Sequence, residues 1–208
     1  MWRTMTMAST LLAASAAMGQ TVNFDADRAG AAPANWTCGV TGRGNPRWTV
    51  EPDPGAPSLP NVLVQSGVGD FPWCVRDGTA IADGFVQVKF KPLRGREDQA
   101  GGVVWRWKDG KSYYVARANA LENNVCLYYT EAGRRTTLKC VDAPVAANVW
   151  HLLRVEFTHT RMNVLLDGKL VIQMDDTHIA GAGAMGVWTK ADSVTAFDDF
   201  SYGTSGRP

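Results

Sequence analysis

From about residue 80 to the end of the chain, hydrophobic and polar positions alternate in short runs. Successive side chains of a strand point to opposite faces of a sheet, so this two-residue period predicts half-buried strands. The runs are also rich in β-branched and aromatic residues, which favour strands. They read FVQVKFKP, GGVVWRW, SYYVARA, VCLYY, RTTLKCV, WHLLRVEFT, MNVLLD, KLVIQM, GAMGVWT and VTAFDDFSYG. Residues 20–80 carry shorter apolar pieces between segments rich in Gly, Pro, Asn and Asp, and predict strands joined by long loops.

The turns between these runs indicate how the strands pair. Asp109-Gly110 and Asp167-Gly168 each lie between two runs. Asp-Gly suits a tight hairpin whose central residues need positive φ, so each pair predicts antiparallel neighbours. About ten short strands with almost no helical period then predict an all-β fold, with two antiparallel sheets packed face to face or a closed barrel. Residues 118–124 are the one place where a helical turn is compatible with the sequence.

The chain of 208 residues suits one globular domain behind an export signal. Its first segment, MWRTMTMASTLLAASAAMGQ, has the positive start, short apolar run and small-residue exit of a signal peptide. We expect a signal peptide over residues 1–19 and a single domain over residues 20–208, periplasmic or secreted. The alternative is a buried N-terminal helix. No run is long and apolar enough to span a bilayer.

The charge of the chain limits the classes of partner that we expect, and its cysteine content indicates the cellular compartment. The chain has 21 Lys and Arg against 20 Asp and Glu and no basic run, so neither nucleic acid nor an acidic membrane is an expected partner. Four cysteines in an exported chain predict two disulfides. Cys126 and Cys140 are equidistant from Gly133, so a hairpin turning there places them opposite each other. Cys38 and Cys74 then pair by elimination.

Enzyme signatures are largely missing from the sequence. It has no G-x-S-x-G, H-E-x-x-H or P-loop motif, and GAGAMG over residues 181–186 leads into a strand rather than the helix that a dinucleotide fingerprint needs. Sandwich-fold glycosidases place carboxylates at alternate strand positions. Only Asp25 with Asp27 and Glu51 with Asp53 alternate, and the second pair lies between prolines. These acids do not predict a catalytic pair.

A structural calcium ion is the one cofactor for which the sequence offers candidates. Asp199 in the last strand and Asp25 near the start of the mature chain are able to share an ion if the termini meet. The alternative is that both are solvated acids. C-x-x-C spacing is absent and the histidines are scattered, which argues against a zinc site.

Aromatic and charged side chains gather in two segments. In GVWTKAD the alternation places Trp188, Lys190 and Asp192 on one face of a strand and Val187 on the other, toward the core. WRWKDGKSYYVARANALENN adds Arg106, Arg117 and further polar residues near one hairpin. Aromatic rings present a flat face to the C–H groups of a sugar, and charged or amide side chains bind its hydroxyls. Two interpretations stay open: a glycan-binding face, or an ion-pair network that satisfies itself.

The sequence resembles a bacterial family of concanavalin A-like domains, labelled 3-keto-disaccharide hydrolase-like and similar in fold to laminin G domains and family-sixteen glycoside hydrolases. The resemblance extends over residues 22–203 and is most distinctive in YYVARANALENN and WTKADS. It implies a jelly-roll sandwich with a concave sheet, export, and a carbohydrate or glycoside partner. On the concave face it places Arg106, Arg117, Asn119, Glu122, Asn123, Asn124, Trp188, Lys190 and Asp192.

The sequence departs from that resemblance in two places. The family has an arginine and a small residue where this chain has Cys126 and Cys140, so a disulfide replaces part of the polar surface. The alternating carboxylates of family-sixteen glycosidases are missing. The first hypothesis is therefore carbohydrate binding without cleavage. The second is hydrolysis or lysis of (3-keto-)disaccharides with Glu122 or Asp192 as acid or base, and the third is a structural or interaction module.

Overall fold

The computed structural model describes residues 19–204, which form fifteen strands and contain no helix. Eight strands make sheet A. Its order is β13 (Lys169–Asp175), β12 (Arg161–Leu166), β11 (His151–Thr158), β6 (Gly84–Arg94), β15 (Val194–Thr204), β4 (Asn61–Gln65) and β3 (Trp48–Pro52), with β1 (Gln20–Val22) paired to β15. The predicted signal peptide lies outside the described residues except for Gly19.

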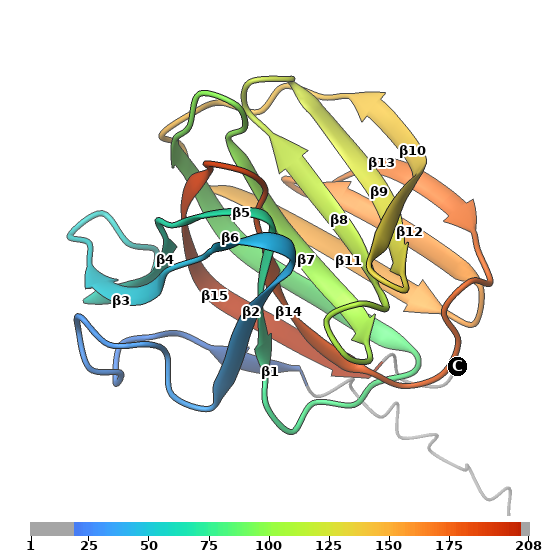
Figure 1. The fold of residues 1–208 in the computed structure, drawn as a ribbon, viewed down its shortest axis with the longest axis horizontal. Helices are drawn as coiled ribbons and strands as arrows, with labels where there is room; N and C mark the ends of the chain where they lie inside the picture. Colours follow the sequence, from blue (N-terminus) through green and yellow to red (C-terminus); the bar gives the residue numbers. More distant parts are fainter. Residues whose placement is uncertain (1–18, 205–208) are drawn as a thin grey trace, which may run out of the picture.

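Seven strands make sheet B. Its order is β10 (Arg134–Asp142), β9 (Asn124–Glu131), β8 (Tyr113–Asn119), β7 (Ala100–Trp107), β14 (Ala184–Trp188), β5 (Val68–Arg76) and β2 (Trp36–Asn45). Within residues 19–204 the paired strands of both sheets are antiparallel, and the sheets lie face to face (Figure 1). The predicted all-β sandwich is confirmed.

Hydrophobic side chains at alternate positions of the strands fill the space between the two sheets. On β6, Val86, Val88 and Phe90 are fully buried in the core, whereas the residues between them are partly exposed on the outer face of sheet A. On β14, Val187 belongs to the same core and Trp188 to a separate buried cluster on the outer face of sheet B. The predicted inward orientation of Val187 is therefore confirmed.

The predicted hairpins form, with one difference in geometry. Asp167 and Gly168 have φ of 50° and 78°, as a tight turn between β12 and β13 requires. In the β7–β8 hairpin only Gly110 of the predicted pair has positive φ, and the N–H of Lys108 donates to the carbonyl of Ser112. That connection is a longer loop than we predicted. The segment between β8 and β9 is a turn and not a helix.

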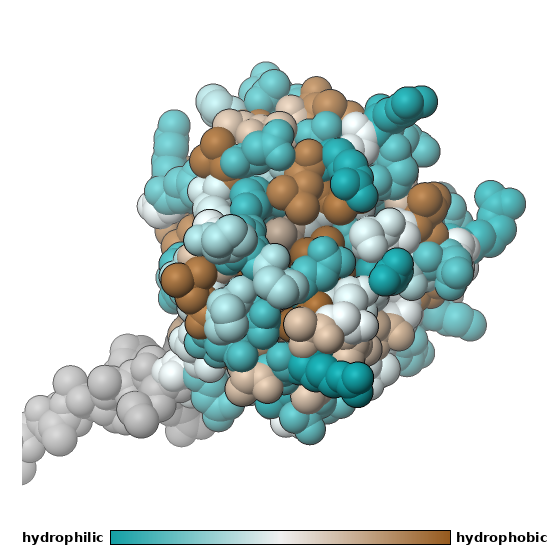
Figure 2. Space-filling model, turned by 90° about the vertical axis from the view of Figure 1, so that its left-hand side faces the viewer, coloured by the Kyte–Doolittle hydropathy of each residue, from teal (hydrophilic) through white to brown (hydrophobic). Residues whose placement is uncertain are grey.

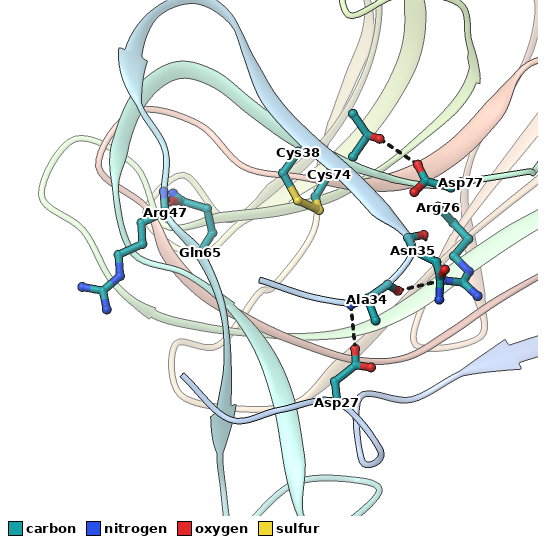
Figure 3. The surroundings of a disulfide bond; sticks show 10 residues. Asp27, Ala34, Asn35, Cys38, Arg47, Gln65, Cys74, Arg76 and Asp77 are labelled. Atoms are coloured by element: carbon teal, nitrogen blue, oxygen red, sulfur yellow. Dashed lines mark hydrogen bonds between the residues drawn. A yellow bond between two sulfur atoms is a disulfide. The ribbon is translucent and has the colours of Figure 1, made fainter. Parts of the chain in front are cut away.

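Both predicted disulfides are present. Cys38 on β2 is bonded to Cys74 on β5 (Figure 3), and Cys126 on β9 to Cys140 on β10. The turn after β9 pairs Glu131 with Arg134, a register that alone would leave Cys140 one residue past Cys126. A bulge between Thr137 and Lys139 shifts the register by one residue and brings the cysteines opposite each other.

The termini meet, since β1 pairs with β15 (Figure 1). The two calcium candidates nevertheless have separate partners: Asp25 accepts a hydrogen bond from the backbone N–H of Asn61, and Asp199 pairs with Lys89 at 2.8 Å. Within residues 19–204 no group of three or more His, Cys, Asp or Glu side chains is arranged to hold a metal ion. In the same part of the chain no helix is long and apolar enough to cross a bilayer.

Candidate functional site

The outer face of sheet B is strongly curved. β10 and β5 are five steps apart in the strand order, which is about 24 Å in a flat sheet of ordinary spacing. Cζ of Arg135 on β10 nevertheless lies 4.4 Å from the ring centroid of Phe71 on β5 and 5.7 Å from that of Trp188 on β14. The sheet therefore curls, and this outer face, called the concave face below, brings side chains from its edge onto those of its middle.

Aromatic side chains line this concave face. Trp188 is fully buried and stacks on Phe71, with ring centroids 6.0 Å apart. Trp73 and Trp107 pack against each other at 5.1 Å. The aromatic floor consists of Phe71, Trp73, Trp107, Tyr113, Tyr128 and Trp188. Most of its surface is covered by neighbouring side chains, and Phe71 is among the more accessible of these rings.

Arg117 on β8 forms a polar network at one end of the floor, in which its Nε has no hydrogen-bond partner. Its side chain is only 4% exposed. One terminal nitrogen donates to Glu122 at 2.7 Å and the other to Asn124 at 3.0 Å, while Asn124 also donates to Glu122. Burial raises the pKa of Glu122, but the hydrogen bonds from Arg117 and Asn124 outweigh it and the pKa is lowered. Glu122 is therefore held as a carboxylate.

A second network lies beside the first and is centred on a fully buried carboxylate. Asp98 accepts hydrogen bonds from Nζ of Lys190 at 2.6 Å and from the amide of Asn119 at 2.7 Å. Lys190 is close enough to lower the pKa of Glu122. The sequence prediction that Arg117 and Lys190 lie near each other on this face is thus consistent with the structure.

Asp192 has a different role from the one its alternation suggested. Its carboxylate accepts the backbone N–H groups of Arg96, Glu97 and Asp98 at 2.7, 3.0 and 3.1 Å. Burial raises the pKa of Asp192, and these three N–H groups more than offset it, so the pKa is lowered. Asp192 therefore holds the loop that carries Asp98 and does not present a free carboxylate.

A hollow of about 490 Å³ opens next to the floor. Phe71 supplies an aromatic wall, and Lys190 connects the hollow to the Asp98 network. Its other side chains are charged or apolar: Arg43, Val68, Asp70 and Glu97. Val68 is 62% exposed, so an apolar surface is available at the rim. On the side of the molecule seen in Figure 2, hydrophobic residues occur only in small groups among hydrophilic ones.

Two predicted ligand residues lie elsewhere. Arg106 has φ of 47° at a register shift in β7, which turns its side chain away from the concave face. Its guanidinium donates to the carbonyls of Ala82, His159 and Ile179. Asn123, also at positive φ, is exposed in the turn, and its side chain accepts the N–H of Val145. Both residues organise loops, because positive φ redirects a side chain that strict alternation would place on the face.

Arg135 is a further residue of the concave face that the sequence did not single out. Its guanidinium lies over three rings, with Cζ at 4.3 Å from the ring centroid of Tyr128 in addition to the contacts with Phe71 and Trp188. Burial lowers its pKa. The concave face therefore combines an aromatic floor with three cations, of which Arg117 and Lys190 are paired.

The sequence matches no family model and no curated protein. The comparison of folds, in contrast, is decisive. The chain has the fold of a jelly-roll sandwich of two antiparallel sheets. The specific 3-keto-disaccharide hydrolase-like family is not shown by these comparisons.

Three solved structures illustrate the similarity. The carbohydrate binding module CBM66 from Bacillus subtilis matches with a TM-score of 0.64 at 20% identity, over 80% of this chain and 94% of that one. A prokaryotic β-1,3-1,4-glucanase (lichenase) derived from a mouse hindgut metagenome has a TM-score of 0.57 at 14% identity, over 89% and 98%. A Bacillus subtilis protein of unknown function with a galectin-like fold has a TM-score of 0.59 at 12% identity, over 84% and 91%.

Proposed function

We propose that this chain is a non-catalytic carbohydrate-binding domain that holds a glycan at the concave face of sheet B, with the hollow beside Phe71 as its entrance. The observation that carries the proposal is the aromatic wall of an open hollow of about 490 Å³ next to cationic side chains. An aromatic ring stacks on the C–H face of a sugar, and charged groups around it bind hydroxyls. Two proteins of similar fold, a carbohydrate binding module and a lichenase, support this class of ligand.

The electrostatics favour binding over hydrolysis. A glycosidase needs one carboxyl group whose pKa is raised, so that it protonates the leaving oxygen near neutral pH. The two catalytic candidates, Glu122 and Asp192, both have lowered pKa values, and both are occupied by hydrogen bonds. Neither is suited to act as the general acid. Hydrolysis of (3-keto-)disaccharides, the activity implied by the family resemblance, is thus the weaker proposal.

A structural or interaction module is the second candidate function. It is favoured by the burial of Trp188 and Tyr113 under side chains of the same chain, which leaves much of the aromatic floor covered. We also propose that the chain is exported with residues 1–19 as signal peptide. Its two disulfides support this, since such bonds persist in oxidising compartments.

Calorimetric titration of the purified mature chain tests the binding proposal. The panel contains neutral oligosaccharides (cellohexaose, laminarihexaose and fructan oligomers) and acidic ones (oligogalacturonate and sulfated dextran oligomers). We expect at least one of them to bind. Phe71→Ala should weaken that binding about tenfold or more, because the stacking wall is lost.

Phe85→Ala is the matched control, because Phe85 lies in a hollow of similar size on the outer face of sheet A. It should leave the affinity unchanged. Absence of binding across the panel, or equal affinity of wild type and Phe71→Ala, would overturn the proposal. Chromatography after incubation with glycosides and 3-keto-glycosides tests the hydrolase alternative. Product release that Glu122→Gln abolishes would show that the domain is catalytic.

A further inference from the structure

Arg135 differs from the other arginines that reach into the fold. Arg106 and Arg117 are almost completely buried, and both have partners: backbone carbonyls and Asp83 for Arg106, and Glu122 with Asn124 for Arg117. Within residues 19–204 no carboxylate lies within 4.0 Å of the Arg135 guanidinium, and its side chain forms no hydrogen bond there. Arg135 is therefore a partly buried cation with no carboxylate in direct contact among the described residues, although the charge of the buried Asp98 acts on it through space.

The positions of the Arg135 guanidinium nitrogens show which hydrogen-bond partners the side chain lacks. Nη1 is enclosed and without a hydrogen-bond partner, against the rings of Phe71, Tyr128 and Trp188. The rest of the guanidinium is not enclosed. Aromatic rings under a guanidinium stabilise it by less than the cost of burying an unpaired charge. The remaining N–H groups are free to bind an anion in a forked, charge-assisted arrangement.

Arg135 does not line the hollow itself, but it lies beside it, over the ring of Phe71. Phe71 forms a wall of the hollow, and Cζ of Arg135 lies 4.4 Å from the centroid of its ring. Because the guanidinium covers one face of the Phe71 ring, a pyranose that packs against the exposed part of Phe71 places its substituents beside Arg135. The lining of the hollow carries both signs of charge: Lys190 is paired with the buried Asp98, and Arg43 with Asp70, while Glu97 is a further carboxylate. Arg135 is therefore the cation beside the hollow that has no carboxylate in contact among the described residues.

We infer that the ligand of the concave face is an acidic saccharide, whose anionic group binds the unpaired guanidinium of Arg135 while its ring packs against the exposed part of Phe71. The inference rests on the proposed function and adds the charge of the sugar to it. A carboxylate of a uronate and a sulfate ester both present oxygens that match a guanidinium fork. The experiment therefore carries one arm for each.

The test compares calorimetric affinities of the mature chain for oligogalacturonate, its methyl ester, sulfated dextran oligomers and the unsulfated dextran oligomers. We expect one acidic probe to bind at least about tenfold more tightly than its neutral counterpart, since a hydrogen bond to a charged group contributes about 1.5–3 kcal/mol. Arg135→Gln should remove that preference. Arg134→Gln is the matched control, because it removes the same charge from an exposed neighbour that points away from the face.

The outcomes separate the two claims. A preference for an acidic probe that is lost in Arg135→Gln and kept in Arg134→Gln supports the inference, and the probe that shows it identifies carboxylate or sulfate. Binding of neutral and acidic probes with equal affinity overturns the inference and leaves the proposed function standing. Equal losses in both variants also overturn it, since they indicate attraction by net charge alone. Absence of all binding overturns both. Arg135→Lys, which keeps the charge but not the planar fork, and the melting temperature of each variant show that a loss is not a failure to fold.

Discussion

The two outer faces of the sandwich have hollows of similar size and differ in how their charges are satisfied. On sheet A a hollow of about 470 Å³ is lined by Phe85, Arg154 and Glu156, among others. Arg154 donates to Glu156 and to Gln87 and lies 4.1 Å over the Phe85 ring. On the concave face the aromatic floor is present as well, but its central cation, Arg135, has no acceptor among the described residues.

The rest of the outer face of sheet A follows the same pattern of internal pairing. Lys89 pairs with Asp199, and Arg161 with Asp175. Further along, the segment between β3 and β4 covers the sheet, where Asp53 pairs with Lys91. The volume of a hollow therefore does not identify a binding face in this fold. An unsatisfied charge above an aromatic wall is the more informative feature.

The largest effect is expected from Trp188→Ala. Trp188 is fully buried and supports both Phe71 and Arg135, so its removal should lower the free energy of unfolding by about 3–5 kcal/mol. Phe85→Ala should cost clearly less, because Phe85 is only partly buried. Urea denaturation of both variants measures the difference, and equal losses would contradict the structural distinction between the faces.

The second effect concerns the disulfide that holds β10 against β9. Replacing Cys126 and Cys140 together by Ser should lower the free energy of unfolding by about 3 kcal/mol, the contribution expected for a loop of this length. Arg135 lies on the released strand, so glycan affinity should fall as well. Retained affinity at temperatures where the variant is folded would show that β10 does not need the disulfide to place Arg135.

A third and smaller loss of stability is expected when the network around Arg117 is broken, and it should exceed the loss from breaking an ion pair on sheet A. Glu122→Gln should destabilise the fold by about 1 kcal/mol at neutral pH, a figure kept low because Glu122 is 40% exposed in its side chain. The lowered pKa of Glu122 means that its contribution is complete above the ordinary value of 4.5 and is lost as the pH falls through the folded value. The difference between wild type and variant, measured by urea denaturation, should therefore shrink below pH 4.5. A difference that stays constant into acid would contradict the pairing.

The smallest effect is expected on sheet A. Arg161 and Asp175 are both about half exposed, and Arg161→Gln should change the free energy of unfolding by less than about 0.5 kcal/mol and leave glycan affinity unchanged. A loss of affinity in this variant, measured by calorimetry, would place a binding surface on the wrong face for our proposal.

The fold could be predicted from the sequence because the hydrophobic alternation, the turn residues and the cysteines all indicated the same architecture. Alternation placed Val187 inward and Trp188 outward, and the Asp167-Gly168 dipeptide adopted the positive φ that its turn needs. The spacing of Cys126 and Cys140 about Gly133 predicted one disulfide, and elimination left Cys38 and Cys74 for the other. These features are local or follow from a period of two, so they survive without knowledge of the tertiary contacts.

The candidate site was harder to predict from the sequence, because a single bulge or a single residue with positive φ moves side chains from one face of a sheet to the other. The bulge between Thr137 and Lys139 reverses the alternation along β10. Cys140 and Arg135 are an odd number of residues apart, so strict alternation assigns them to opposite faces, whereas the bulge places Arg135 over the concave floor. The positive φ of Arg106 has the opposite effect and removes it from that floor. No sequence pattern marked Asp98 as a residue of the site, since its partners Lys190 and Asn119 are distant from it in the sequence.

The most direct test of the central claim uses the tryptophan indole N–H signals in a nitrogen-15 spectrum of the mature chain. Trp73, Trp107 and Trp188 lie on the concave face, and Trp36, Trp48 and Trp105 lie in the core between the sheets. With each signal assigned by a Trp→Phe variant, saturation with the oligosaccharide that binds in the panel should shift the concave-face signals and leave the core signals in place. Shifts confined to Trp150, which donates to Gly55 on the covered part of sheet A, would show that the glycan binds the other face and would contradict the account.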